Sequence, residues 1–121
     1  MKKQNKIFED LTAKKIGNCT VKMVDGDRYW YYRGKLHRED GPAVECTNGN
    51  KYWYKKGKLH REDGPAVKLV DGTEHWFVKG QRHRVGGPAV TYADDTKYWY
   101  INGKRIAKTE SILELLELLE I

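Results

Sequence analysis

The sequence has no long apolar run and is poor in cysteine, proline and phenylalanine. Its 121 residues include two Cys, three Pro and two Phe. A membrane-spanning helix needs about 18 or more consecutive apolar residues, and a secretory signal has a basic, then apolar, then small-residue pattern. Because neither pattern is present, we expect a cytoplasmic protein.

The two cysteines, Cys19 and Cys46, lie far apart and form no CxxC pair. This usage favours two reduced thiols in a reducing compartment over a disulfide, which is the alternative.

Disorder would be the natural reading of a chain with 39% hydrophobic and 33% charged residues if aromatic residues were scarce. They are not scarce, because the chain has eight Tyr, four Trp and two Phe. Large side chains can build a core from few residues. The length suits one domain spanning residues 1–121 with a modest core.

Charge is unevenly distributed along the chain. The formal net charge is +6, but residues 109–121 contain four Glu and no Lys or Arg. The first 108 residues therefore hold 23 basic and 13 acidic residues, a formal charge of +10. Such a cationic body favours anionic partners.

A strict 23-residue period organises the chain. The ten residues KLHREDGPAV occur at 35–44 and again, unchanged, at 58–67. The same spacing separates Trp30, Trp53, Trp76 and Trp99, then Gly34, Gly57, Gly80 and Gly103, and then His37, His60 and His83. Self-similarity at a fixed period is the signature of a repeat architecture.

Each unit reads as a strand, a tight turn, a second strand and a charged return loop. The turn signals are Asp25-Gly26, Asn48-Gly49 and Asp71-Gly72, with Asp94-Asp95 in the fourth unit. Asn-Gly and Asp-Gly favour β-hairpin turns. We therefore predict that residues 18–107 form one elongated antiparallel sheet of about eight strands, two from each stacked hairpin.

Alternation along the strands predicts the core. Residues two apart in a strand share a sheet face. The first strands carry the pairs Val21 and Met23, Val44 and Cys46, Val67 and Leu69, and Val90 and Tyr92. The second strands carry a Trp row on one face and, on the other, Tyr29 and Tyr31, Tyr52 and Tyr54, His75 and Phe77, and Tyr98 and Tyr100. We predict that the Trp and Val rows form the core, and that the Tyr row is either partly covered by return loops or exposed.

The segment YWYKKGKLHREDGPAV, residues 52–67, resembles a divergent form of the MORN repeat found in phage, viral and bacterial proteins. The resemblance covers about residues 20–106. It implies stacked β-hairpins that form a scaffold for binding proteins or lipids, without catalysis. The usual MORN sequence pattern is richer in Tyr-Gly pairs and lacks the His-Arg-Glu-Asp loop. The resemblance therefore implies no activity for this chain.

At the N-terminus, residues 5–16 are predicted to form a short helix that caps the repeats. Ile7, Phe8 and Leu11 lie at helical spacing, and Gly17 is a stop signal. End units of a repeat array need such caps because they expose a sheet edge.

At the C-terminus, residues 109–121 are predicted to form a second capping helix. Ser111 and Glu114 have the spacing of a capping box. Glu114, Glu117 and Glu120 then recur every three residues and leave the remaining face apolar. Because an isolated helix this short is marginal in water, it should dock over the end of its own sheet or against another copy, which would give a homodimer.

The loop containing His37, Arg38, Glu39 and Asp40 could serve acid-base chemistry, a metal or the scaffold. Equivalent residues of successive units lie two strands apart, about 9.6 Å, whereas ligands of one zinc ion lie within about 2 Å of it. The third unit, QRHRVGG, lacks both carboxylates, and the fourth, KRIAK, lacks the histidine. We therefore expect a scaffold role, with His bound to backbone and Arg paired to an acidic residue of a neighbouring unit. We expect no catalytic residue, metal or cofactor.

A binding role for the same region is the alternative. The candidate binding residues are an aromatic row and the basic residues of the loops: Tyr31, Tyr54, Phe77, Tyr100, Arg38, Arg61, Arg84, His37, His60 and His83.

These observations predict a non-catalytic module that binds a protein partner. Tyr, Trp and Arg are enriched at interface hot spots, and here they recur in rows. The phage and viral occurrence of the resembling repeats suits a small inhibitor of a host enzyme or defence complex. Two alternatives are binding of nucleic acid or a nucleotide through a basic aromatic face, and adhesion to an anionic membrane, which an acidic terminal helix does not favour.

Overall fold

The computed structural model describes residues 13–108, 116 and 117. These residues are mainly β, with an antiparallel sheet built from many hairpins and almost no helix. Within the described residues, no helix has the length and apolar character needed to cross a membrane.

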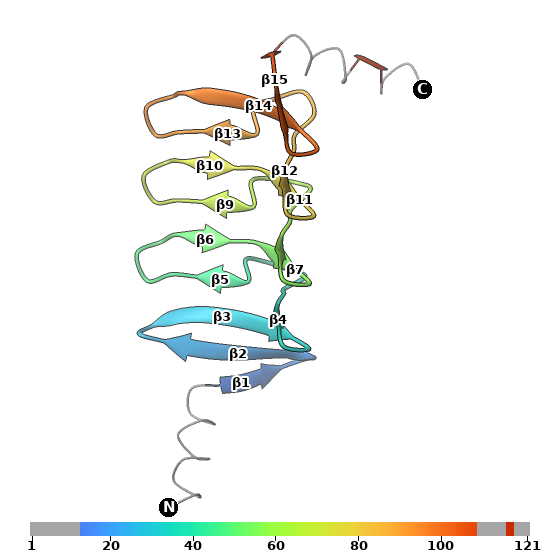
Figure 1. Ribbon diagram of the computed structural model, residues 1–121. Helices are drawn as coiled ribbons and strands as arrows, with labels where there is room; N and C mark the ends of the chain where they lie inside the picture. The colour runs from blue at the N-terminus through green and yellow to red at the C-terminus, as the bar shows by residue number, and fades with distance from the viewer. Residues whose placement is uncertain (1–12, 109–115, 118–121) are drawn as a thin grey trace, which may run out of the picture.

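The main sheet has eleven strands, ordered β1-β2-β3-β5-β6-β9-β10-β13-β14-β15, with β4 paired to β3. All of its pairings are antiparallel. Figure 1 shows its long hairpins stacked in chain order. The strands are β1 (Ala13–Ile16), β2 (Cys19–Val24), β3 (Asp27–Tyr32), β4 (Lys35–Leu36), β5 (Val44–Glu45), β6 (Lys51–Tyr52), β9 (Val67–Lys68), β10 (Glu74–His75), β13 (Val90–Thr91), β14 (Lys97–Ile101) and β15 (Lys104–Ile106).

Each unit also forms a second, short hairpin, which lies in a separate column beside the long hairpins (Figure 1). Two of these hairpins are independent two-stranded sheets, β7–β8 and β11–β12. Their strands are β7 (Tyr54–Lys55), β8 (Lys58–Leu59), β11 (Phe77–Val78) and β12 (Gln81–Arg82). The prediction of a plain return loop after the second strand was therefore wrong, and so was the prediction of a single sheet with about eight strands.

Type I′ turns close the short hairpins. The φ angles of Lys56 and Gly57 are both positive, at 51° and 80°. Two consecutive residues with positive φ also occur at 33–34, 79–80 and 102–103. Positive φ at both central residues defines a type I′ turn, which matches the twist of the flanking strands. The chain can therefore reverse within two residues after each tryptophan strand.

The long hairpins confirm the predicted turn sites but use two turn types. Asp25 and Gly26 both have positive φ and close a two-residue turn. In the second unit, the Cys46 amide donates to Asn50 O and the Gly49 amide donates to Cys46 O, which gives a three-residue loop. This extra residue shifts the register, since Val21 faces Trp30 whereas Val44 faces Tyr52.

In the second and third units the chain changes direction at tryptophan. Trp53 separates β6 from β7, and Trp76 separates β10 from β11. The Trp53 amide donates to Ala66 O at 2.7 Å, and Trp53 O accepts from the His60 amide at 3.0 Å. These bonds join Trp53 to the return loop at the point where β6 ends and β7 begins.

The buried core consists of small apolar residues: Val21, Ala43, Val44, Ala66, Val67, Ala89 and Val90. The predicted Val row is thus buried. In register, a ladder of Tyr29, Val44, Tyr52, Val67, His75, Val90 and Tyr98 crosses the main sheet. The Val row therefore alternates with the Tyr row, and the four tryptophans are only half-buried.

Residues 13–16 contradict the predicted N-terminal helix over residues 5–16. They form β1, which pairs with β2, and Gly17 lies in the turn between the two strands with φ 61°. Gly17 thus permits a hairpin turn rather than ending a helix. The rest of that predicted cap, residues 5–12, lies outside the described residues.

Of the predicted C-terminal helix, only residues 116 and 117 are described, and both are helical. The helix and its capping or dimerising role otherwise fall outside the described residues and stay predictions.

Candidate functional site

Each loop histidine joins its own unit to the next. The Lys56 amide donates to His37 Nδ1 at 2.9 Å, and the Lys79 amide donates to His60 Nδ1 at 2.9 Å. The donors lie at the first position of the next type I′ turn, where backbone amides lack a partner within the turn. This agrees with the predicted bond from His to backbone. The third member of the series is His83, whose Nδ1 accepts from the Asn102 amide at 3.0 Å.

Each loop arginine covers a tryptophan of its own unit. The guanidinium carbon of Arg38 lies 3.8 Å from the ring centroid of Trp30, Arg61 lies 4.0 Å from Trp53, and Arg84 lies 3.9 Å from Trp76. A guanidinium over an indole face is attracted by the ring quadrupole. These stacks cover part of the tryptophan surface that the apolar core leaves open.

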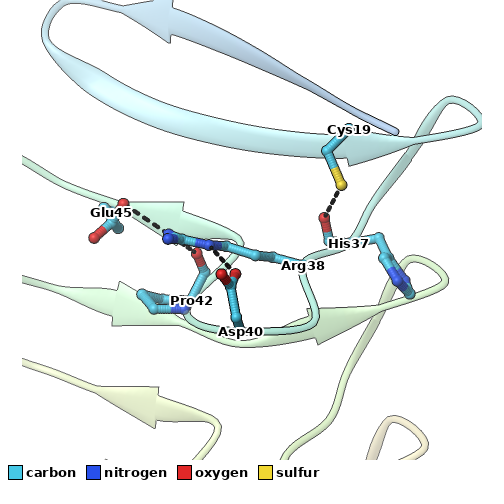
Figure 2. Close-up of polar contacts among 6 residues, drawn as sticks. All are labelled: Cys19, His37, Arg38, Asp40, Pro42 and Glu45. Atoms are coloured by element: carbon cyan, nitrogen blue, oxygen red, sulfur yellow. Dashed lines mark hydrogen bonds and ion pairs between the residues drawn. The ribbon is translucent and has the colours of Figure 1, made fainter. Parts of the chain in front are cut away.

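Hydrogen bonds from both Nε and Nη1 hold the guanidinium of Arg38 in place. Figure 2 shows the side chain extended between Asp40, Pro42 and Glu45. Nε donates to Asp40 at 3.0 Å, and Nη1 donates to Pro42 O at 3.2 Å and to Glu45 at 3.1 Å. Glu45 belongs to the next unit, as predicted for the arginine partner, but Asp40 belongs to the same loop. The prediction does not hold for Arg61, whose ion-pair partner among the described residues is Asp63 of its own loop.

The third unit shows which of these bonds depend on carboxylates. Arg84 has Val85 and Gly86 where the other loops have Glu and Asp, yet Nη1 still donates to Pro88 O at 3.2 Å. Its stack on Trp76 is also kept. The geometry of the His-Arg pair is therefore independent of the neighbouring acids.

The glutamates of the loops are mostly exposed, and Glu39 bridges two units. It accepts from His37 Nε2 at 3.2 Å and lies 3.4 Å from Lys55 Nζ. The hydrogen bond from Lys55 is the main cause that lowers the pKa of Glu39. The equivalent contact in the next loop, from His60 Nε2 to Glu62, is 3.5 Å.

The predicted aromatic binding row is half-buried. It comprises Tyr31, Tyr54, Phe77 and Tyr100. Burial raises the pKa of Tyr54, and Tyr54 O accepts from the Arg38 amide at 3.2 Å. The backbone of this row therefore supports the loops, and its rings are only partly available to a partner.

The His and Arg candidates form part of the scaffold, because their side chains bind neighbouring backbone groups. Shallow hollows lie between successive loops. One hollow of about 630 Å³ lies between the Arg38 and Arg61 loops and reaches Trp53. A second, of about 510 Å³, lies between the Arg61 and Arg84 loops and reaches Trp76. Within residues 13–108, no group of three or more His, Cys, Asp or Glu side chains could hold a metal ion.

His75 occupies the position that is tyrosine in the other three units, Tyr29, Tyr52 and Tyr98. Burial, with a smaller contribution from Arg82, lowers the pKa of His75 from its ordinary value of 6.5. Its Nδ1 is buried and has no hydrogen-bond partner among the described residues. Such an atom costs about 1–3 kcal/mol.

His75→Tyr should therefore raise the free energy of unfolding at pH 7 by about 1 kcal/mol, the lower end of that penalty. Because the folded pKa lies below the unfolded one, wild-type stability is full above pH 6.5 and is lost as the pH falls through the folded value. Urea unfolding at pH 7.5 and 5.5 should show a smaller loss for His75→Tyr than for wild type. Equal losses of stability in the two proteins would rule out His75 as the source of the pH dependence.

Both cysteines are free. Cys19 Sγ donates to His37 O at 3.9 Å (Figure 2). The thiol is thus a weak partner of the histidine backbone.

Sequence reasoning missed the tips of the short hairpins. They present six exposed cations that make no ion pair among the described residues, and we call this set the basic ridge: Arg33, Lys35, Lys56, Lys58, Lys79 and Lys104. The available signal was Asn102-Gly103, a strong type I′ sequence that aligns with Arg33-Gly34, Lys56-Gly57 and Lys79-Gly80 of the other units.

Comparison with protein-family models, with curated proteins and with solved structures finds no match to this chain. The resemblance to MORN repeats therefore stays a prediction from the sequence.

Proposed function

We propose that the protein is a non-catalytic module that binds a protein partner. The third unit carries this proposal, because His83 and Arg84 keep their bonds to Asn102, Pro88 and Trp76 without the loop carboxylates. Residues that hold the same geometry with and without the acids serve the scaffold rather than acid-base chemistry. What a partner can reach is then the repeated outer surface of stacked hairpins.

The architecture that suits this function is a MORN-like repeat array. Equivalent strands such as β5, β9 and β13 recur every 23 residues, which supports this class. In the same proposal, residues 109–121 form a helix that caps the last hairpin or joins two copies. An inhibitor of a host enzyme or defence complex would need only such a rigid, displayed surface.

The test is capture from a host lysate with the tagged protein, at about 0.1 M and about 0.5 M salt, because the higher salt shortens the Debye length well below roughly 10 Å. A nuclease-treated sample is run in parallel. We expect one protein retained under all conditions and displaced by excess untagged protein. Loss of all binding after nuclease treatment would contradict the proposal.

Nucleic-acid binding is the second candidate, and the basic ridge is the observation that favours it. Phosphate contacts make binding strongly salt-dependent. Affinity for an oligonucleotide that does not change between low and high salt would exclude it.

A further inference from the structure

The turns of the short hairpins carry cations and no acidic residue. Their sequences are RGKL at 33–36, KGKL at 56–59, KGQR at 79–82 and NGKR at 102–105. Short hairpins from successive units are stacked in one column (Figure 1), so the turns that carry the basic ridge follow one another along this column. Units repeat every two strands, or about 9.6 Å.

Lysine stems of the ridge are packed against the backbone. A Cβ placed at Gly57 would lie 3.6 Å from Cβ and Cδ of Lys35, and one at Gly80 would lie 3.6 Å from the same atoms of Lys58. Each stem therefore crosses the glycine of the next turn and leaves its ammonium at the tip. Lysine commonly buries its stem in this way, and the packing reduces the rotamer freedom that a ligand would have to freeze.

A hollow of about 480 Å³ lies among these turns. Its lining is wholly basic apart from one histidine: Lys35, Lys55, Lys56, Lys58, Lys79 and His60. Of these lysines, only Lys55 makes an ion pair among the described residues, with Glu39. The site therefore gathers five lysines with one ion-paired carboxylate among the described residues, and this excess of positive charge favours recruitment of an anionic ligand.

We propose that the basic ridge binds an extended, acidic peptide segment of a protein partner, an inference that rests on the proposed function. An extended chain rises about 3.3 Å per residue, so three residues match one unit of the ridge. Carboxylates recurring along such a segment would meet cations in each unit.

The lining of the hollow favours an acidic peptide over nucleic acid. No Phe, Tyr or Trp side chain lines the hollow, whereas single-stranded nucleic acid uses such aromatic side chains as stacking platforms.

The third unit contributes only Lys79 to the ridge. Gln81 stands where the other units have Lys35, Lys58 and Lys104. A Cβ placed at Gly103 would lie 3.6 Å from Cβ, Cγ and Cδ of Gln81, so this side chain crosses Gly103 as the lysines cross their glycines. Gln81→Lys should therefore add a charge to the ridge without changing the fold.

The test measures fluorescence anisotropy of a labelled peptide of about ten glutamates, long enough to span roughly 33 Å. The Lys56→Gln, Lys58→Gln double variant should bind about tenfold more weakly, and Gln81→Lys about threefold more tightly, as expected for exposed charge pairs. The matched control is Lys51→Gln with Lys68→Gln, two exposed lysines that face each other in the main sheet. It should change the affinity less than about twofold.

Three outcomes would overturn the inference: an equal loss in the control, no gain from Gln81→Lys, or tighter binding of an oligothymidylate of the same length than of the peptide. Lysate capture separates this result from the proposed function. If the ridge variants retain the captured protein, the module still binds a protein, and the basic ridge is not where it binds.

Discussion

Trp53→Ala should lower the free energy of unfolding by about 3 kcal/mol, the lower end of the range for truncating a buried aromatic side chain, because Trp53 is half-buried. Trp53 lies at the corner between the two columns of hairpins, with Arg61 stacked 4.0 Å from its ring centroid. Removing the indole leaves Arg61 without the surface on which it lies. Urea unfolding followed by circular dichroism gives the loss directly.

Trp99→Ala is the matched control for this prediction. No arginine is stacked on Trp99 among the described residues, and its closest cation is Lys108 Nζ at 5.9 Å from the ring centroid. It also belongs to the last unit, so fewer neighbours depend on it. We expect a clearly smaller loss, and a loss for Trp99→Ala that equals or exceeds that for Trp53→Ala would contradict the role given to the Arg-Trp stack.

Gly64→Ala should cost about 2 kcal/mol through a steric effect on one side chain. A Cβ at Gly64 would lie 2.7 Å from Cζ and 2.9 Å from Nη1 of Arg61. Gly64 does not have a left-handed φ, so alanine is not strained there by its backbone. The added methyl group would push Arg61 away from Trp53 and from Pro65 O, to which Nη1 donates at 3.1 Å.

A double-mutant cycle isolates this effect. The closest atoms to the added methyl group all belong to Arg61. In an Arg61→Ala background, Gly64→Ala should therefore be neutral or slightly stabilising, since alanine also restricts the unfolded chain. Equal losses in both backgrounds would show that Gly64 is required for another reason.

The long hairpins were predictable because their turns carry Asp-Gly and Asn-Gly pairs between alternating strands. The short hairpins were not, because Arg33, Lys56 and Lys79 are poor type I′ residues. These residues adopt positive φ, a conformation that costs roughly 1–2 kcal/mol for most residues. The amides of Lys56 and Lys79 each gain a bond to a histidine of the preceding unit, and such a long-range compensation leaves no local sequence signal.

The candidate site was predictable in its residues but not in its geometry. The histidines and arginines stood out by their 23-residue spacing. Arg61 covers Trp53 of its own unit, and this tryptophan is half-buried instead of part of the apolar core. Both features depend on the corner at Trp53. At this corner the backbone of Trp53 bonds to Ala66 and His60, an arrangement that no periodicity reveals.

Hydrogen exchange of three backbone amides tests most directly whether the His-Arg loops hold neighbouring units together. Lys56, Lys79 and Asn102 lie in exposed turns, yet each of their amides donates to a histidine Nδ1. All three should exchange slowly in the wild-type protein. His60→Ala should make the Lys79 amide exchange rapidly while the amides of Lys56 and Asn102 stay protected. If all three amides of the wild-type protein already exchange as fast as those of an unfolded peptide, the scaffold role of the histidines is contradicted.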